Sequence, residues 1–134
     1  EKVHRAVMDH DGLAAHGLEH CPAFAARADE LLEAVRGKTV VIHDRTMDLL
    51  WLNRELQATR PSAPRFEDCC TVIDSFVLAR AVPSERRRNG LDALLEWYGL
   101  GARGGHHDAY GDAALLSRVF FELWWDLDEW LYGE

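Results

Sequence analysis

Two short apolar runs, each followed at once by a helical pattern, constrain the fold of this chain more than any other feature of its sequence. They are residues 39–43 (TVVIH) and residues 70–74 (CTVID). Short runs rich in β-branched residues are typical of strands buried on both faces of a sheet. The repeated order of strand, turn and helix predicts an α/β fold.

In the segments before and after these strands, apolar residues recur at helical spacing. This spacing predicts helices over residues 22–36, from 44 to about 56, 91–98 and about 108–132, with a helical turn at 76–79. Stretches 58–68, 83–90 and 101–105 carry proline, glycine or clustered charge and are interpreted as loops. The 134 residues, without internal repeats, have room for a single domain, residues 1–134.

The composition of the chain argues against some classes of function. A formal net charge of −8 argues against a protein that holds nucleic acid mainly by neutralising phosphates, although it leaves room for an acidic, metal-dependent enzyme. No apolar run approaches the roughly 20 residues that span a bilayer. Cys21, Cys69 and Cys70 match neither a disulfide framework nor a zinc site, so we expect buried thiols and a reducing, cytoplasmic location.

Four segments occur in an order that points to one family. In chain order they are 15–24 (AHGLEHCPAF), 40–50 (VVIHDRTMDLL), 72–80 (VIDSFVLAR) with 89–94 (NGLDAL), and 107–113 (HDAYGDA). Together they resemble the DEDDh-type 3′→5′ exonucleases, the DnaQ-like branch of the RNase H-like fold. Asp44 stands where that family usually has Asn, and Met47 where it usually has Phe.

The resemblance implies a role for each motif residue. His107 would be the general base that takes a proton from the attacking water. Asp48 and Asp112 would be catalytic carboxylates that hold Mg²⁺ or Mn²⁺ in a two-metal site. His43 and Asp44 would contact the substrate, the 3′ end of single-stranded DNA or RNA.

Each of these residues also has an ordinary structural interpretation. Alone, Asp48 would be a helix-start carboxylate and His107 a solvated loop histidine, but the motif order favours function for both. His43 alone would be a packed residue, and His106 a surface residue. Asp74 is interpreted as structural, accepting hydrogen bonds from backbone donors at the strand end.

One departure from the family pattern is serious. The family's first motif, Asp-x-Glu on its first strand, supplies two central metal ligands, and only the superficially similar stretch 9–11 (DHD) stands in for it. We therefore expect an N-terminally truncated RNase H-like fold, with helices packed on a reduced sheet and an incomplete metal site. The chain begins at Glu1 without an initiator methionine, which fits either a missing upstream segment or ordinary processing.

Two functions follow as hypotheses. The first is a metal-dependent 3′→5′ exonuclease domain, inactive on its own in this form. The second is a non-catalytic exonuclease-like binding or scaffolding module, favoured by the negative charge, Asp44 and the aromatic C-terminus. The run 86–88 (RRR) is interpreted as a solvated surface.

The C-terminal helix carries more aromatic surface than one face can bury. We predict core positions at Phe120, Leu123, Trp124, Leu127 and Leu131. We predict that the remaining aromatic residues contact a partner chain or a second copy of this chain, and we expect no membrane contact. These residues are Phe121, Trp125, Trp130 and Tyr132.

Overall fold

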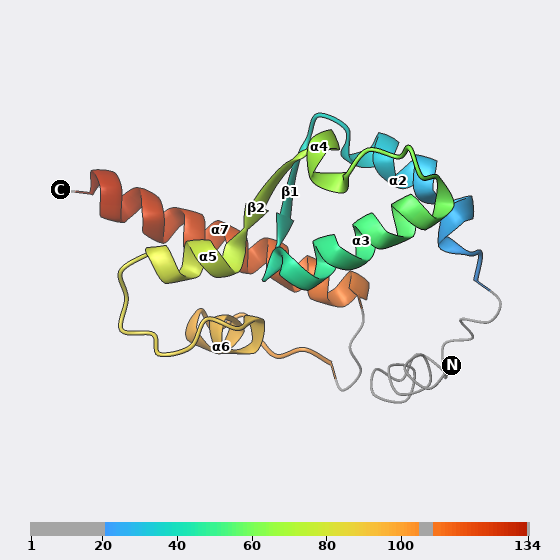
Figure 1. The fold of residues 1–134 in the computed structure, drawn as a ribbon. Coiled ribbons are helices and arrows are strands. Elements are labelled where there is room, and N and C mark those ends of the chain that lie inside the picture. Colours follow the sequence, from blue (N-terminus) through green and yellow to red (C-terminus); the bar gives the residue numbers. More distant parts are fainter. Residues whose placement is uncertain (1–20, 105–108, 134) are drawn as a thin grey trace.

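The computed structural model describes residues 21–104 and 109–133 (Figure 1). Its elements, in chain order, are η3 (Phe24–Ala26), α2 (Ala28–Val35), β1 (Thr39–Ile42), α3 (Arg45–Thr59), α4 (Phe66–Cys69), β2 (Thr71–Asp74), α5 (Ser75–Ala81), α6 (Leu91–Trp97) and α7 (Ala109–Tyr132). Among these helices none is long and apolar enough to cross a membrane.

The two predicted strands form a parallel sheet. Thr39 lies opposite Thr71 and Ile42 opposite Asp74, so the carboxyl ends of both strands meet at one end of the sheet. Within the described part of the chain, no strand pairs with the other edge of β1. The predicted α/β fold with a reduced sheet is confirmed.

Two hydrophobic clusters hold the helices around this sheet. One joins α2, α3 and α4 through Ala28, Leu32, Leu56 and Phe66, and strand residues pack against it. The other joins α5, α6 and α7 through Ala79, Leu94, Leu95, Val119 and Leu123. Figure 1 shows the strands between these two groups of helices.

Asp74, the last residue of β2, connects the starts of two helices. Its carboxylate accepts hydrogen bonds from the backbone N–H groups of Asp44 (3.1 Å), Arg45 (3.2 Å), Phe76 (2.9 Å) and Val77 (3.4 Å). These donors belong to the first turns of α3 and α5, where backbone N–H groups have no partner inside the helix. The structural interpretation of Asp74 is confirmed.

We predict that Asp74→Ala lowers the free energy of unfolding by about 2 kcal/mol, as expected for a lost helix cap that also joins two elements. Although burial opposes it, the four N–H donors lower the pKa of Asp74. This stabilisation is therefore complete above the unfolded-state pKa and is lost as the pH falls through the lower folded-state pKa. Urea unfolding at several pH values measures it, and Asp68→Ala, at an exposed position, is the matched control. Equal losses for the two variants would contradict the capping role.

Three local predictions are wrong or shifted. The stretch 58–68 was predicted as loop throughout, but it ends in α4 because Asn53 Oδ1 accepts a hydrogen bond from the Phe66 N–H at 2.7 Å. The predicted helix at 22–36 is divided into η3 and α2, which begins at Ala28. Asp108, the predicted start of the last helix, lies outside the described residues.

Arg86 corrects the interpretation of residues 86–88 as a solvated run. Its side chain is only 1% exposed. It donates hydrogen bonds to Tyr98 Oη (2.9 Å) and the Ala79 carbonyl (3.0 Å), and it pairs with Asp126 at 3.4 Å. These contacts fasten the loop before α6 to α5 and α7.

The predicted core face of α7 is partly wrong. Leu123 is fully buried, but Trp124 and Leu131 are each about half exposed. The reason for Trp124 is its position around the helix, because fully buried Val119 and Leu123 define the face of α7 that packs on α5 and α6, and Trp124 lies about one quarter-turn away from that face. Leu131 lies on the same line as Trp124, and α7 also extends beyond α5 and α6 at this end (Figure 1).

Candidate functional site

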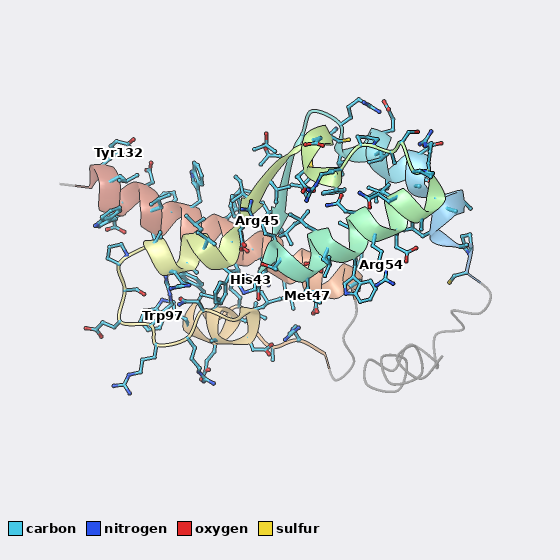
Figure 2. The ribbon with its side chains drawn as sticks, viewed as in Figure 1. His43, Arg45, Met47, Arg54, Trp97 and Tyr132 are labelled. Atoms are coloured by element: carbon cyan, nitrogen blue, oxygen red, sulfur yellow. The ribbon has the colours of Figure 1, made fainter. Side chains whose placement is uncertain are left out.

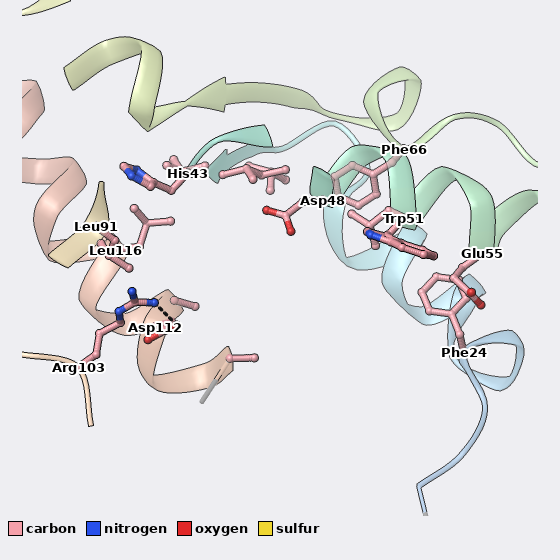
Figure 3. A pocket seen from close by; sticks show the side chains of 16 residues that line it. Phe24, His43, Asp48, Trp51, Glu55, Phe66, Leu91, Arg103, Asp112 and Leu116 are labelled. Carbon is pink, nitrogen blue, oxygen red and sulfur yellow. Dashed lines mark hydrogen bonds and ion pairs between the residues drawn. The ribbon is translucent and has the colours of Figure 1, made fainter. Parts of the chain in front are cut away.

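A pocket of about 770 Å³ lies beside β1, between α3 and the first turns of α7. Val40, Val41 and Ile42 form one wall, on the strand whose second edge has no described partner. Most of the lining is apolar, with charged side chains at a few positions (Figure 3). A mostly apolar cavity with a few convergent polar groups is the usual setting of a binding or active site.

Asp48 and Asp112, widely separated in the sequence, both line this pocket. Each lies in the first turn of a helix, α3 and α7 respectively, where the helix dipole favours negative charge. Figure 3 shows the two side chains on different walls of the same pocket. The sequence prediction that these carboxylates share a site therefore has a geometric basis, while their catalytic role stays a prediction.

The two carboxylates differ in their surroundings. Burial and, to a smaller extent, the nearby charge of Asp44 raise the pKa of Asp48. No hydrogen bond or cation from the described residues offsets this effect at Asp48. Asp112, in contrast, accepts a hydrogen bond from Arg103 Nη1 at 3.1 Å. Of these two carboxylates, Asp48 is thus the one without a described cationic neighbour.

Arg103 is a pocket residue that the sequence interpretation missed. Its guanidinium forms a two-point contact with Asp92 of α6, at 2.7 Å for both Nε and Nη2, and reaches Asp112 with its third nitrogen. The hydrogen bond to Asp92, followed by that to Asp112, raises the pKa of Arg103, so it stays charged. Its position in a glycine-rich loop gave no sequence signal for this role.

His43 lies at the end of β1 and lines the pocket, but its ring is well packed. Nδ1 lies 2.9 Å from Ser75 Oγ, and that hydroxyl donates to the Ile42 carbonyl at 3.2 Å. Nε2 is buried without a described hydrogen-bond partner. Burial, only partly offset by the Asn89 backbone and nearby carboxylates, lowers the pKa of His43 and favours the neutral ring. Contact with a substrate stays a prediction for His43.

Asp44 follows directly and has the left-handed backbone conformation, with φ of 60°. Asn and Asp are the non-glycine residues that tolerate this conformation best. Asp44 is exposed and does not line the pocket, although its charge acts on Asp48. Its substrate-binding role is not tested by this geometry.

His107, the predicted general base, lies outside the described residues. Ala109, two positions later, is described and lines the pocket, and Asp112 follows one helical turn further on. The described chain therefore lines the pocket again from Ala109 onward.

The acidic residues fit a divalent cation only in part. Carboxylate oxygens are the hard ligands that Mg²⁺ and Mn²⁺ prefer, and Asp48 is a carboxylate at the pocket wall whose negative charge no described cation offsets. However, residues 21–104 and 109–133 contain no group of three or more potential ligands close enough to share one ion. Asp48 and Asp112 can supply part of a metal site, and further ligands must come from elsewhere.

Comparison with known proteins gives a consistent result. The sequence model of a family described as Exonuclease matches residues 1–120. The DNA polymerase III subunit epsilon of Escherichia coli (strain K12) is 32% identical over 123 residues, which cover 87% of this chain and 50% of that protein. The subunit of the same name from Rickettsia conorii is 32% identical over 113 residues, covering 84% of this chain and 49% of that protein. The chain thus spans about half the length of the curated relatives it matches.

Proposed function

Because the chain belongs to the DEDDh-type, DnaQ-like exonuclease family, we propose that it forms part of a metal-dependent 3′→5′ exonuclease domain that acts on 3′ ends of single-stranded DNA or RNA. One observation carries the proposal. Asp48 and Asp112, which the family motifs single out, line a single pocket at the side of β1.

Each polar group of the pocket has a distinct task in this proposal. Asp48 and Asp112 hold the divalent cations, and Arg103 keeps the Asp112 side chain oriented toward the pocket through its anchor on Asp92. Bound Mg²⁺ or Mn²⁺ supplies positive charge that activates water and stabilises the leaving oxygen. His107 accepts the proton of the attacking water. In this proposal His43, which lines the pocket, and exposed Asp44 contact the nucleotide chain.

The edge of β1 that has no partner among the described residues is the proposed place for the family's first motif. Residues 1–134 contain no Asp-x-Glu sequence. A strand carrying that motif could pair with this edge of β1 and fill the apolar pocket with its side chains. Its two carboxylates would then join Asp48 and Asp112 and complete the ligand set.

A chimera that places a family member's first strand, with its Asp-x-Glu motif, ahead of residue 1 tests this function. We expect it to shorten 5′-labelled single-stranded DNA stepwise from the 3′ end with Mg²⁺ or Mn²⁺. Asp112→Asn should lower the rate by about 10²–10³-fold, because a metal ligand contributes several kcal/mol of transition-state stabilisation.

The matched control is Asp92→Asn. It also removes a carboxylate partner of Arg103, but Asp92 does not line the pocket. Its rate should fall less than that of Asp112→Asn, by about 10–100-fold at most, the range typical of a lost supporting contact. Equal losses for Asp92→Asn and Asp112→Asn would mean that the Arg103 network, rather than a metal ligand, explains the effect.

A non-catalytic exonuclease-like module is the second candidate. It is favoured by the absence of a three-ligand group among the described residues. In that case the chimera would stay inactive under conditions where its circular dichroism shows a folded protein.

A further inference from the structure

The outer side of α7 carries an exposed apolar stripe made of Phe121, Trp124, Trp125, Leu131 and Tyr132, here called the outer seam. All five side chains are at least half exposed, with Trp125 at 72% and Tyr132 at 76%. Figure 2 shows Tyr132 at the free end of α7, away from the other helices. The outer seam lies beyond residues 1–120, the part of the chain that the exonuclease family model matches.

The spacing of the outer seam is that of a helix-packing surface. Trp124 and Leu131 are seven residues apart, as are Trp125 and Tyr132, so each pair lies on one line of the helix. Leu123 projects roughly opposite to this surface and is fully buried against α5 and α6. The orientation of α7 is fixed by Asp126, which accepts hydrogen bonds from Tyr98 Oη at 2.5 Å and from buried Arg86. The outer seam therefore faces away from the body of the domain.

One acidic residue lies inside the outer seam. Asp128 is seven residues after Phe121, and Glu122 and Glu129 flank the same surface. Residues 121–134 hold five acidic residues and no Lys, Arg or His, and the last turn of α7 has no basic residue. Negative charge at the C-terminal end of a helix opposes the helix dipole, so a cation from elsewhere would stabilise this end.

The negative charge of the outer seam limits which kind of molecule can bind to it. Phosphates of a nucleic acid or anionic lipids would be repelled by the acidic residues. A second copy packed seam to seam would bring the acidic residues of both copies together, and like charges at an interface are strongly unfavourable. We infer that the outer seam binds an amphipathic helix of another protein, with apolar residues against the aromatic side chains and a Lys or Arg against Asp128.

Two synthetic three-heptad helical peptides with identical leucine seams provide the probe. One has Lys at the position facing Asp128 and at the flanking positions, and the other has Glu at all of them. Binding to the complete 134-residue chain is measured by fluorescence anisotropy of labelled peptide. We expect the Lys peptide to bind at least about tenfold more tightly than the Glu peptide.

Charge reversal gives the decisive comparison. Asp128→Lys should invert the preference of the chain for the two peptides. Glu85→Lys, at an exposed loop position, makes the same change in net charge and should leave the preference as it was. Trp125→Ala should weaken binding at least about tenfold, whereas Trp51→Ala, at another exposed tryptophan, should not.

Several outcomes would overturn the inference. They are no binding of either peptide, equal binding of both, or an equal response of Asp128→Lys and Glu85→Lys. Light scattering supplies one more: a stable dimer of the chain alone that is lost in Trp125→Ala would assign the outer seam to a second copy. None of these results depends on exonuclease activity, so the proposed function is tested separately.

Discussion

The 134-residue chain alone is expected to release nucleotides from single-stranded DNA at least about 10³-fold more slowly than the chimera that carries the first motif, with either Mg²⁺ or Mn²⁺. Two of the family's four metal-site carboxylates have no counterpart in this sequence. A missing ligand pair removes several kcal/mol of transition-state stabilisation, and each 1.4 kcal/mol is a factor of ten in rate.

The structure gives this expectation a concrete reason. The described residues place Asp48 and Asp112 in the pocket but supply no third ligand, and Asp112 already contacts the Arg103 guanidinium. A divalent cation would have to exchange its water ligands for two carboxylates only, which Mg²⁺ does reluctantly.

Nuclease contamination is the main confounding factor in such an assay. Asp48→Asn, purified in parallel, is the control, because contaminating activity is the same in both preparations. Rapid stepwise degradation by the 134-residue chain that disappears in Asp48→Asn would overturn the expectation. It would mean that residues 1–134 already complete a metal site.

Features that rest on short-range patterns were predictable from the sequence. The strands at Thr39–Ile42 and Thr71–Asp74 follow from short runs rich in β-branched residues, a composition that favours strands. The role of Asp74 follows from its place between a strand and a helix, where backbone N–H groups need an acceptor. The grouping of Asp48 with Asp112 came from motif resemblance, since nothing local connects them.

Features that depend on contacts between distant segments were not predictable. Burial of Arg86 requires Tyr98 and Asp126 on two other helices, and a run of three arginines contains no sign of them. The exposure of Trp124 depends on which side of α7 contacts α5 and α6, and apolar residues occur on more than one side of this helix, so periodicity alone does not identify the buried face. The position of Arg103 in the pocket likewise depends on its contacts with Asp92 of α6 and Asp112 of α7, which the sequence around Arg103 does not indicate.

His107→Ala in the chimera is expected to lower exonuclease activity by about 10²–10⁴-fold, the usual cost of losing a general base, without changing the unfolding midpoint. A histidine base acts only in its unprotonated form, so the rate of the parent chimera should rise with pH through the histidine range. The residual rate of His107→Ala should lose that rise, a change that a purely structural role would not produce. His106→Ala, at the adjacent histidine, is the matched control and should keep both the rate and the pH profile. An unchanged rate in His107→Ala at neutral pH would remove His107 from the mechanism and leave activation of the water to the metal ions alone.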